Sequence, residues 1–265
     1  MIDFVHLVCD YAPGDMAWAE IRSAFSSELG VSVRLHATAV KSFDTIGTGF
    51  VLAQLSLAPE ELRAKKLLVF ANTAPRKDRH TPRENNEGEG LLYARLKNGV
   101  LVVAVNSGYS LSFVRDEIVE LWSTNVVEAG SQFRSRDYFP RIVGQVVSDD
   151  LSCLVNQLAV AENIPAPPES VVAYRDSFGN LKTTIKTGDK TVMALKEGMR
   201  IKIKIGSIVR AATVATGSFN VLEGDLAFAP GSSGHKGRYW ELFVRSGSAW
   251  EEFGRPASGS EVIIE

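Results

Sequence analysis

The sequence is poor in cysteine, in long apolar runs and in excess positive charge, and each shortage excludes a class of protein. Its two cysteines, Cys9 and Cys153, fit no CxxC or metal-ligand spacing, so both are predicted to be small core residues. No stretch approaches the roughly 20 apolar residues of a membrane span, and no basic leader opens the chain. The net charge of −2 provides no global positive field for a phosphate backbone. We therefore expect a cytoplasmic protein that binds neither membrane nor nucleic acid, with no metal and no bound cofactor.

The chain has enough apolar residues to form a large core. It is 45% hydrophobic and 23% charged over 265 residues, which is ordinary for a globular protein with one large core or two modest ones. In the first half, apolar runs at 4–9, 31–37 and 66–72 alternate with helical patterns that begin at Asp15 and after Ser42. This βαβαβ order predicts a mostly parallel sheet covered by helices, that is, an α/β sandwich.

The character of the sequence changes near residue 163. Before it, the runs 91–97 and 100–105, joined at Asn98-Gly99, predict a hairpin, and we expect helices at 110–122 and 141–158. The segment "NIPAPPES" (163–170) has three prolines and predicts a linker. After it, short strand-like runs alternate with turns. The predicted domains are an α/β domain at 1–162, a linker at 163–170 and a small all-β barrel at 171–265.

Two segments that follow predicted strands carry carboxylates, and ligands of α/β sheets bind at such strand ends. "CDYAPGD" places Asp10 and Asp15 on either side of a Pro-Gly turn, and "KSFDTIG" places Phe43-Asp44 at the start of a helix. Asp15 and Asp44 have the alternative of capping a helix, and Asp10 that of binding nearby backbone N–H groups. Position alone does not choose between these roles.

Six motifs taken together make the sequence resemble the S-adenosylmethionine hydroxide adenosyltransferase and fluorinase family over its whole length. They are "CDYAPGD" for the family's D-x4-D, "SFDT" for its aromatic-Asp segment and "RKDR" for its loop arginine. "FRSRD" at 133–137 is similar to F-[HY]-[GS]-R-[DE], "DSFGN" at 176–180 to D-x-FGN, and "RYWELFVRSGSA" at 238–249 to the family's Gly-Ser-Ala segment. The resemblance implies a homotrimer that binds an adenosyl ligand at sites between subunits.

The resemblance also implies roles for individual residues. Asp10 would bind the ribose hydroxyls, Asp15 the amino acid ammonium group, and Asn180 the adenine edge, to which an amide can both donate and accept. Asn180 has the alternative of satisfying only its own turn. Phe43 would cover the sugar and the sulfonium. The full set assigned to substrate binding is Asp10, Asp15, Phe43, Asp44, Phe178, Asn180, Ser233, Arg245, Ser246, Gly247 and Ser248.

The implied chemistry is an in-line displacement at the ribose C5′ with methionine as leaving group, helped by alignment and desolvation. The sequence differs from the family's hydrolases at residues that are expected to surround the nucleophile. Asn72 replaces an aspartate and Arg134 a histidine, whereas Arg79 retains an arginine; Ser135 completes the candidate catalytic set. A cation near the sulfonium would cost about 4 kcal/mol at a separation of about 4 Å and an effective dielectric constant of about 20.

Three functions are compatible with these departures. One is an enzyme that splits S-adenosylmethionine into methionine and adenosine or a 5′-substituted adenosine. Another is a binding protein for adenosine or S-adenosylmethionine that has lost hydrolysis. The remaining one is an enzyme for a different, anionic adenosine ligand, clamped by Arg79 and Arg134. Either Arg134 turns outward to a carboxylate such as Asp137, or the pocket prefers an anionic nucleophile or an anionic adenosine ligand.

Overall fold

The computed structural model describes residues 2–58, 60–74, 88–126, 131–217, 220–235 and 237–265. They form two compact units, Met1–Ala166 and Pro167–Glu265. The division falls inside the Pro-rich segment 163–170. Within the described residues, each unit contains a seven-stranded sheet.

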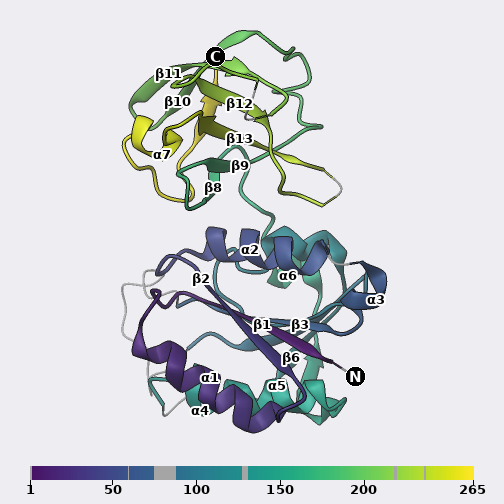
Figure 1. Ribbon diagram of the computed structural model, residues 1–265. Helices are drawn as coiled ribbons and strands as arrows, with labels where there is room; N and C mark the ends of the chain where they lie inside the picture. Colours follow the sequence, from purple (N-terminus) through teal and green to yellow (C-terminus); the bar gives the residue numbers. More distant parts are fainter. Residues whose placement is uncertain (1, 59, 75–87, 127–130, 218–219, 236) are drawn as a thin grey trace. The chain divides into compact units, whose positions relative to one another are not determined.

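Unit 1 is a mixed α/β unit whose sheet has the order β2-β1-β3-β5-β4-β6-β7 (Figure 1). The first four strands in this order pair in parallel, and the remaining pairs are antiparallel. The sheet is thus less parallel than predicted, because the hairpin at Asn98-Gly99 reverses the chain between β4 and β5. The strands are β1 (Phe4–Cys9), β2 (Arg34–Ala39), β3 (Leu67–Asn72), β4 (Leu91–Leu96), β5 (Leu101–Val105), β6 (Ile118–Thr124) and β7 (Leu154–Gln157).

Helices cover both faces of this sheet, and local sequence signals set where the two long ones begin. Asp15 caps α1 by accepting the Ala17 N–H, and Asp44 caps α2 by accepting the Gly47 N–H. Figure 1 shows α1 and α5 on one face and α2 on the other. The helices are α1 (Met16–Leu29), α2 (Thr45–Leu57), α3 (Glu61–Ala64), α4 (Arg134–Asp137), α5 (Phe139–Val147) and α6 (Val160–Asn163).

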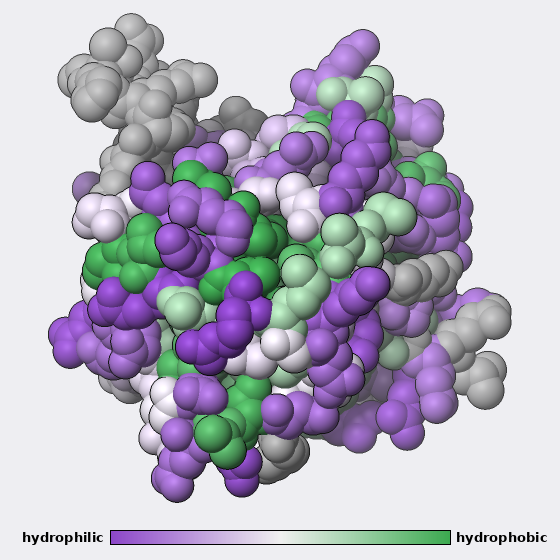
Figure 2. Space-filling model, turned by 90° about the horizontal axis from the view of Figure 1, so that it is seen from above, coloured by the Kyte–Doolittle hydropathy of each residue, from purple (hydrophilic) through white to green (hydrophobic). Residues whose placement is uncertain are grey.

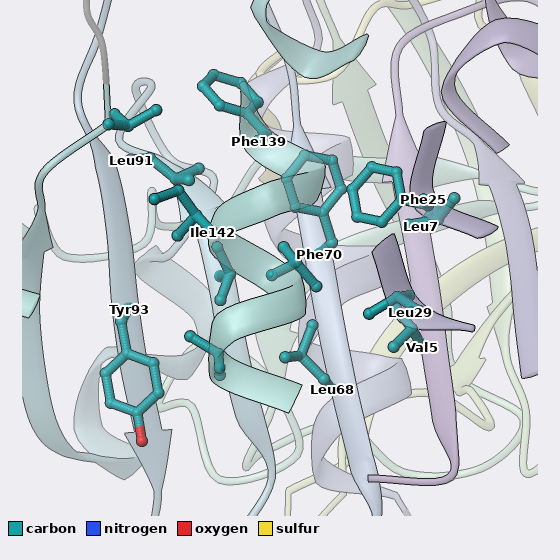
Figure 3. Packing of buried hydrophobic residues seen from close by; sticks show 14 of the residues in the cluster. Val5, Leu7, Phe25, Leu29, Leu68, Phe70, Leu91, Tyr93, Phe139 and Ile142 are labelled. Atoms are coloured by element: carbon teal, nitrogen blue, oxygen red, sulfur yellow. The ribbon is translucent and has the colours of Figure 1, made fainter. Parts of the chain in front are cut away.

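Three aromatic rings centre the core between the sheet and the α1–α5 layer (Figure 3). Phe25 of α1 lies 4.9 Å from Phe70 of β3, and Phe70 lies 6.1 Å from Phe139 of α5, measured between ring centroids. All three are fully buried. Burial of each of these three phenylalanines stabilises the unit by roughly 1.5–3 kcal/mol. Their packing fixes the position of the sheet that includes β1 and β3.

Two predicted helices of unit 1 are wrong in whole or in part. The segment 110–122 instead forms a 3₁₀ turn, η2 (Ser112–Glu117), followed by strand β6; the predicted helix at 141–158 ends with α5 at Val147, followed by η3 (Leu151–Cys153) and β7. The run "IVELWST" is rich in β-branched and aromatic residues and pairs with β4. Its tertiary pairing outweighs any helical spacing of its apolar residues.

Unit 2 is a single curled sheet of order β14-β10-β11-β12-β13-β9-β8. A bridge between Val171 and Glu261 joins its two ends, and the Val262 N–H donates to the Ser170 carbonyl at 2.7 Å. Phe228 and Trp240 meet inside it at 4.6 Å between ring centroids. The elements are β8 (Val172–Arg175), β9 (Leu181–Lys186), β10 (Arg200–Ile205), β11 (Ile208–Val214), β12 (Leu226–Pro230), β13 (Tyr239–Val244), α7 (Ala249–Glu252) and β14 (Val262–Ile264).

The surface of the described residues mixes apolar and hydrophilic side chains. On the face shown in Figure 2, apolar side chains lie in small groups between hydrophilic ones. Among the described residues, no helix has both the length and the apolar character that crossing a membrane requires.

His6 on β1 lies beside His36 on β2, and its environment predicts that stability depends on pH. His6 and His36 are register partners with ring centroids 5.8 Å apart. Burial, and then the charge of His36, lower the pKa of His6 below its usual 6.5. The unfolded chain then binds more protons than the folded one as pH falls below that value, so stability present above about pH 6.5 is lost on acidification.

We expect the His6→Phe variant to show a flatter rise in the free energy of unfolding between about pH 5 and about pH 7.5 than the wild type, because the titrating group is removed. Urea titrations at several pH values measure this slope, and the exposed loop residue His235, changed to alanine, is the control. An unchanged slope in His6→Phe would assign the pH dependence to other groups.

Candidate functional site

A buried carboxylate ties together the loops that follow three parallel strands. Asp10, 7% exposed, comes directly after β1. Its Oδ2 atom accepts the Phe43 N–H at 3.0 Å, from the loop after β2, and the Ala74 N–H at 3.2 Å, from the segment after β3. The strand-end rule of α/β sheets therefore holds here: β1, β2 and β3 end together, and Asp10 lies at their centre.

The Asp10 contact holds Phe43 in an unusual conformation. Phe43 has φ of 64°, in the left-handed region that aromatic residues rarely adopt, and its side chain is 37% exposed. Such a conformation persists when neighbouring contacts fix it and is found preferentially at functional sites. Its neighbour Asp44 and the exposed Asp15 both act as helix caps. Their ligand-binding roles stay predictions.

A hydrogen-bonded chain lies beside this carboxylate and includes a residue that the sequence reasoning missed. Asn72, the last residue of β3, donates its Nδ2 hydrogen to the Tyr11 hydroxyl at 3.1 Å. The same hydroxyl lies 2.7 Å from Oγ of Ser135, which is 4% exposed. Burial is the largest cause that raises the pKa of Tyr11, to about 12. Tyr11 follows Asp10 directly, so the strand-end rule applied one residue further would have found it.

The Arg134 side chain packs against an aromatic ring instead of turning outward to Asp137. Its guanidinium lies over the Phe139 ring at 5.3 Å, a cation–π distance. It also packs on Gly88, where an added Cβ would come within 1.7 Å of Nη2. Asp137 instead binds Arg136, with Nε to Oδ1 at 2.6 Å. Of the two alternatives for Arg134, the one in which it binds Asp137 does not occur, because that carboxylate binds Arg136. Arg79 lies outside the described residues.

In unit 2, the predicted adenine-binding turn is closed by its own aspartate. Asp176 Oδ1 accepts the N–H groups of Phe178 and Asn180, each at 3.0 Å, and the Asn180 side chain donates to Asp176 Oδ2 at 3.0 Å. Asp176 thus forms an Asx-type turn, and the Asn180 amide is engaged within its own turn, which is the alternative that the sequence left open. Gly179 supplies the required left-handed conformation, with φ of 81°. The turn leaves Phe178 77% exposed at its tip.

The second predicted segment of unit 2 packs against this turn. The Trp250 N–H donates to the Gly179 carbonyl at 2.9 Å, and an added Cβ at Gly179 would come within 2.1 Å of Ser248 Oγ. Ser248 also caps α7 through the Glu251 N–H. The structure thus brings segments 178–180 and 246–248 together, as the predicted binding set requires, and only glycine fits at position 179.

The remaining predicted residues of unit 2 have structural roles. Arg245 is exposed and its Nη1 donates to the Val221 carbonyl at 2.8 Å. Ser233 is buried and its carbonyl accepts the Tyr239 N–H at 3.0 Å. Nearby, Lys182 lies 2.7 Å from Glu241 and 3.9 Å from Asp176. This cation therefore neutralises part of the acidic charge beside the Asn180 turn.

The candidate residues thus fall into two groups, one in each unit. Asp10, Phe43, Asn72 and Ser135 meet at the strand ends of unit 1, and Phe178, Asn180 and 246–248 meet in unit 2. Within the described part of the chain, no group of three or more His, Cys, Asp or Glu side chains is arranged to hold a metal ion.

The fold has counterparts among solved structures. An uncharacterized conserved protein from Thermotoga maritima aligns with 98% of this chain and 100% of its own, with a TM-score of 0.77 and 18% sequence identity. A conserved hypothetical protein from Thermus thermophilus aligns over 100% of both chains, with a TM-score of 0.68 and 19% identity. No family model matches the sequence, and no curated protein is similar to it. At these identities, the likeness establishes a shared fold over the whole length.

Proposed function

We propose that this protein cleaves S-adenosylmethionine by nucleophilic displacement at the ribose C5′, releasing L-methionine and either adenosine or a 5′-substituted adenosine. The observation that carries the proposal is the Asp10 carboxylate, fixed by two backbone N–H groups beside Phe43 and the Asn72–Tyr11–Ser135 chain. A fixed, mostly buried carboxylate suits a pair of ribose hydroxyls, because hydrogen bonds to a charged acceptor are the strong ones.

The roles of the other residues follow from their chemistry. Phe43 would cover the sugar and the sulfonium, and Asn180 with the 246–248 backbone would bind adenine, after release of the Asn180 amide from Asp176. The sulfonium leaves as a neutral thioether, so the reaction needs no general acid. It needs alignment of the nucleophile with the C5′–S bond and removal of water from it.

The groups around position 72 favour an anionic nucleophile over water. An amide, a phenol whose pKa is raised to about 12 and a serine hydroxyl are hydrogen-bond donors near neutral pH. Water would have to lose a proton during its attack, whereas a halide needs only donors and desolvation. Arg134, the sequence neighbour of Ser135, carries a further positive charge, with its guanidinium over the Phe139 ring.

A second candidate is a protein that binds an adenosine ligand without chemistry. The replacement of a carboxylate by Asn72 favours it, because the Asn72 amide is engaged with Tyr11 and supplies no base. Calorimetric titration with adenosine and with S-adenosylmethionine tests it. Affinity without turnover would favour this candidate over the enzyme.

The proposed assembly is a cytoplasmic homotrimer in which each site takes residues from two subunits. It follows from the resemblance to the adenosyltransferase family, and Phe178, which is 77% exposed next to the predicted binding set, is open to contact with another chain or a ligand. Light scattering of the purified protein measures the mass directly, and a monomer would remove this part of the proposal.

We expect purified protein incubated with S-adenosylmethionine to form methionine, with a larger yield in chloride than in phosphate buffer of equal ionic strength. Mass spectrometry identifies the nucleophile from the mass of the adenosyl product. A heat-inactivated sample is the control for spontaneous breakdown. The absence of methionine above that control in water, chloride and phosphate would contradict the enzymatic proposal.

A further inference from the structure

We infer that Tyr11 is a positioning residue: its hydroxyl holds the Ser135 hydroxyl with the hydrogen directed at an anionic nucleophile. This inference rests on the proposed function, because the nucleophile is that of the proposed displacement. It adds a residue and a direction of hydrogen bonding to that site.

The direction follows from counting hydrogens along the chain. Asn72 donates to the Tyr11 oxygen. The phenol oxygen lies 2.7 Å from Ser135 Oγ, a contact in which either atom can donate; we assign the single phenol hydrogen to this contact, because the Asn72 amide already donates to the same oxygen. Ser135 is then the acceptor in that contact and keeps its own hydrogen. Among the described residues, Tyr11 is the side-chain partner found for this Oγ. Because Ser135 is 4% exposed, its hydrogen needs an acceptor other than bulk water.

Contacts on several sides hold the Tyr11 ring in place beside Ser135. Trp18 and Phe133 meet it edge-on, with ring centroids at 5.8 Å and 5.9 Å. The Trp18 indole N–H also donates to the Tyr11 carbonyl at 3.1 Å. The raised pKa of Tyr11 keeps the phenol protonated at neutral pH, so that it remains a donor to Ser135.

The Asn72–Tyr11–Ser135 chain ends in the Ser135 O–H group, which is a hydrogen-bond donor. A suitable nucleophile for this donor is an anion that has no proton to lose, and a halide is the simplest example. In the displacement, a chloride lone pair forms the C5′–Cl bond while the electrons of the C5′–S bond move to sulfur. The products are 5′-chloro-5′-deoxyadenosine and neutral methionine, and no proton is transferred. Ser135 would stabilise the anion before attack, held in place by Tyr11.

Asn72 sets the direction of hydrogen bonding along the Asn72–Tyr11–Ser135 chain. A carboxylate at this position would accept the phenol hydrogen instead of donating to the phenol. Ser135 would then donate to Tyr11 and would present its lone pairs to the nucleophile, an arrangement that suits water. The Asn72→Asp variant is therefore expected to shift the product ratio from chloro-deoxyadenosine toward adenosine.

The test compares the Tyr11→Phe variant with the wild type in steady-state kinetics at varied chloride. Phenylalanine keeps the ring contacts and removes only the hydroxyl. We expect KM for chloride to rise about 10-fold and KM for S-adenosylmethionine to stay within about twofold, a split that general loss of structure would not produce. Tyr138→Phe, which removes a hydroxyl from another tyrosine packed against the same core, is the matched control and should behave as wild type.

The outcomes separate this inference from the proposed function. Wild-type turnover with an unchanged KM for chloride in Tyr11→Phe, or wild-type turnover with water alone, would overturn the inference and leave the cleavage proposal standing.

If the wild type gives no turnover, the cleavage proposal fails. Chloride NMR line broadening with adenosine present then tests the anion site. Broadening that is weaker in Tyr11→Phe than in Tyr138→Phe supports the role of Tyr11, and equal or absent broadening overturns it.

Discussion

The Asp10→Asn variant is expected to lose at least about 100-fold in kcat/KM for S-adenosylmethionine while remaining folded. The charged acceptor for the ribose hydroxyls is removed, and charged hydrogen bonds contribute roughly 1.5–3 kcal/mol each. A loss of about 3 kcal/mol corresponds to a factor of about 100. The asparagine oxygen can still accept the N–H groups of Phe43 and Ala74, which Asp10 accepts at 3.0 and 3.2 Å. The loops are thereby kept in place.

Steady-state kinetics and adenosine titration measure this effect together with the melting temperature. Asp150→Asn is the matched control, because Asp150 is an exposed aspartate whose side chain accepts the Ser152 N–H at 3.0 Å at the start of η3. Near-wild-type kinetics for Asp10→Asn would show that this carboxylate only fixes the loops. Unfolding of the variant would be addressed by repeating the titration at lower temperature.

The Gly49→Ala variant is expected to destabilise unit 1 by about 3 kcal/mol, the upper end of the roughly 1–3 kcal/mol that overpacking a core typically costs. Gly49 is buried in α2, where an added Cβ would come within 2.3 Å of the Tyr109 carbonyl oxygen and 2.9 Å of the Phe113 ring. A backbone oxygen cannot rotate away as a side chain can. The helix propensity gained by alanine, about 1 kcal/mol, offsets only part of the cost of this clash.

A urea titration that follows the unfolding of unit 1 measures the change, and a fall in Tm of roughly 10 °C would accompany it. The matched control is Gly144→Ala in α5. There the nearest atoms to an added Cβ lie 3.4 Å away on Glu28, so stability should be unchanged or slightly increased. Wild-type stability of Gly49→Ala would mean that α2 can shift away from the 109–113 segment.

The elements that the sequence predicted correctly are those with local signals. Asp15 begins α1, and Asn98-Gly99 joins β4 to β5, because caps and tight turns depend on a few adjacent residues. Strand β6 was missed because its identity comes from pairing with β4 and β7. Pairing partners distant in sequence leave only a weak trace in local propensity.

The residues of the candidate site likewise divide into those that local sequence predicts and those that depend on contacts with distant residues. The place of Asp10 could be predicted, since any residue after a buried parallel strand reaches the edge where loops meet. The contact of Tyr11 with Ser135 could not, because it joins residues 124 positions apart. The side chain of Arg134 was also unpredictable, because nothing in "FRSRD" indicates that Arg136, rather than Arg134, would bind Asp137.

The bridge that joins the two ends of the unit 2 sheet has a consequence for folding kinetics. Val171 lies just before the first strand of that sheet and Glu261 just before the strand that comes latest. The sheet can therefore close only after nearly the whole unit has emerged from the ribosome. Long-range closure of this kind raises contact order and slows folding. Unit 1 is complete earlier in the chain, so we expect it to fold first during synthesis, with unit 2 closing afterwards.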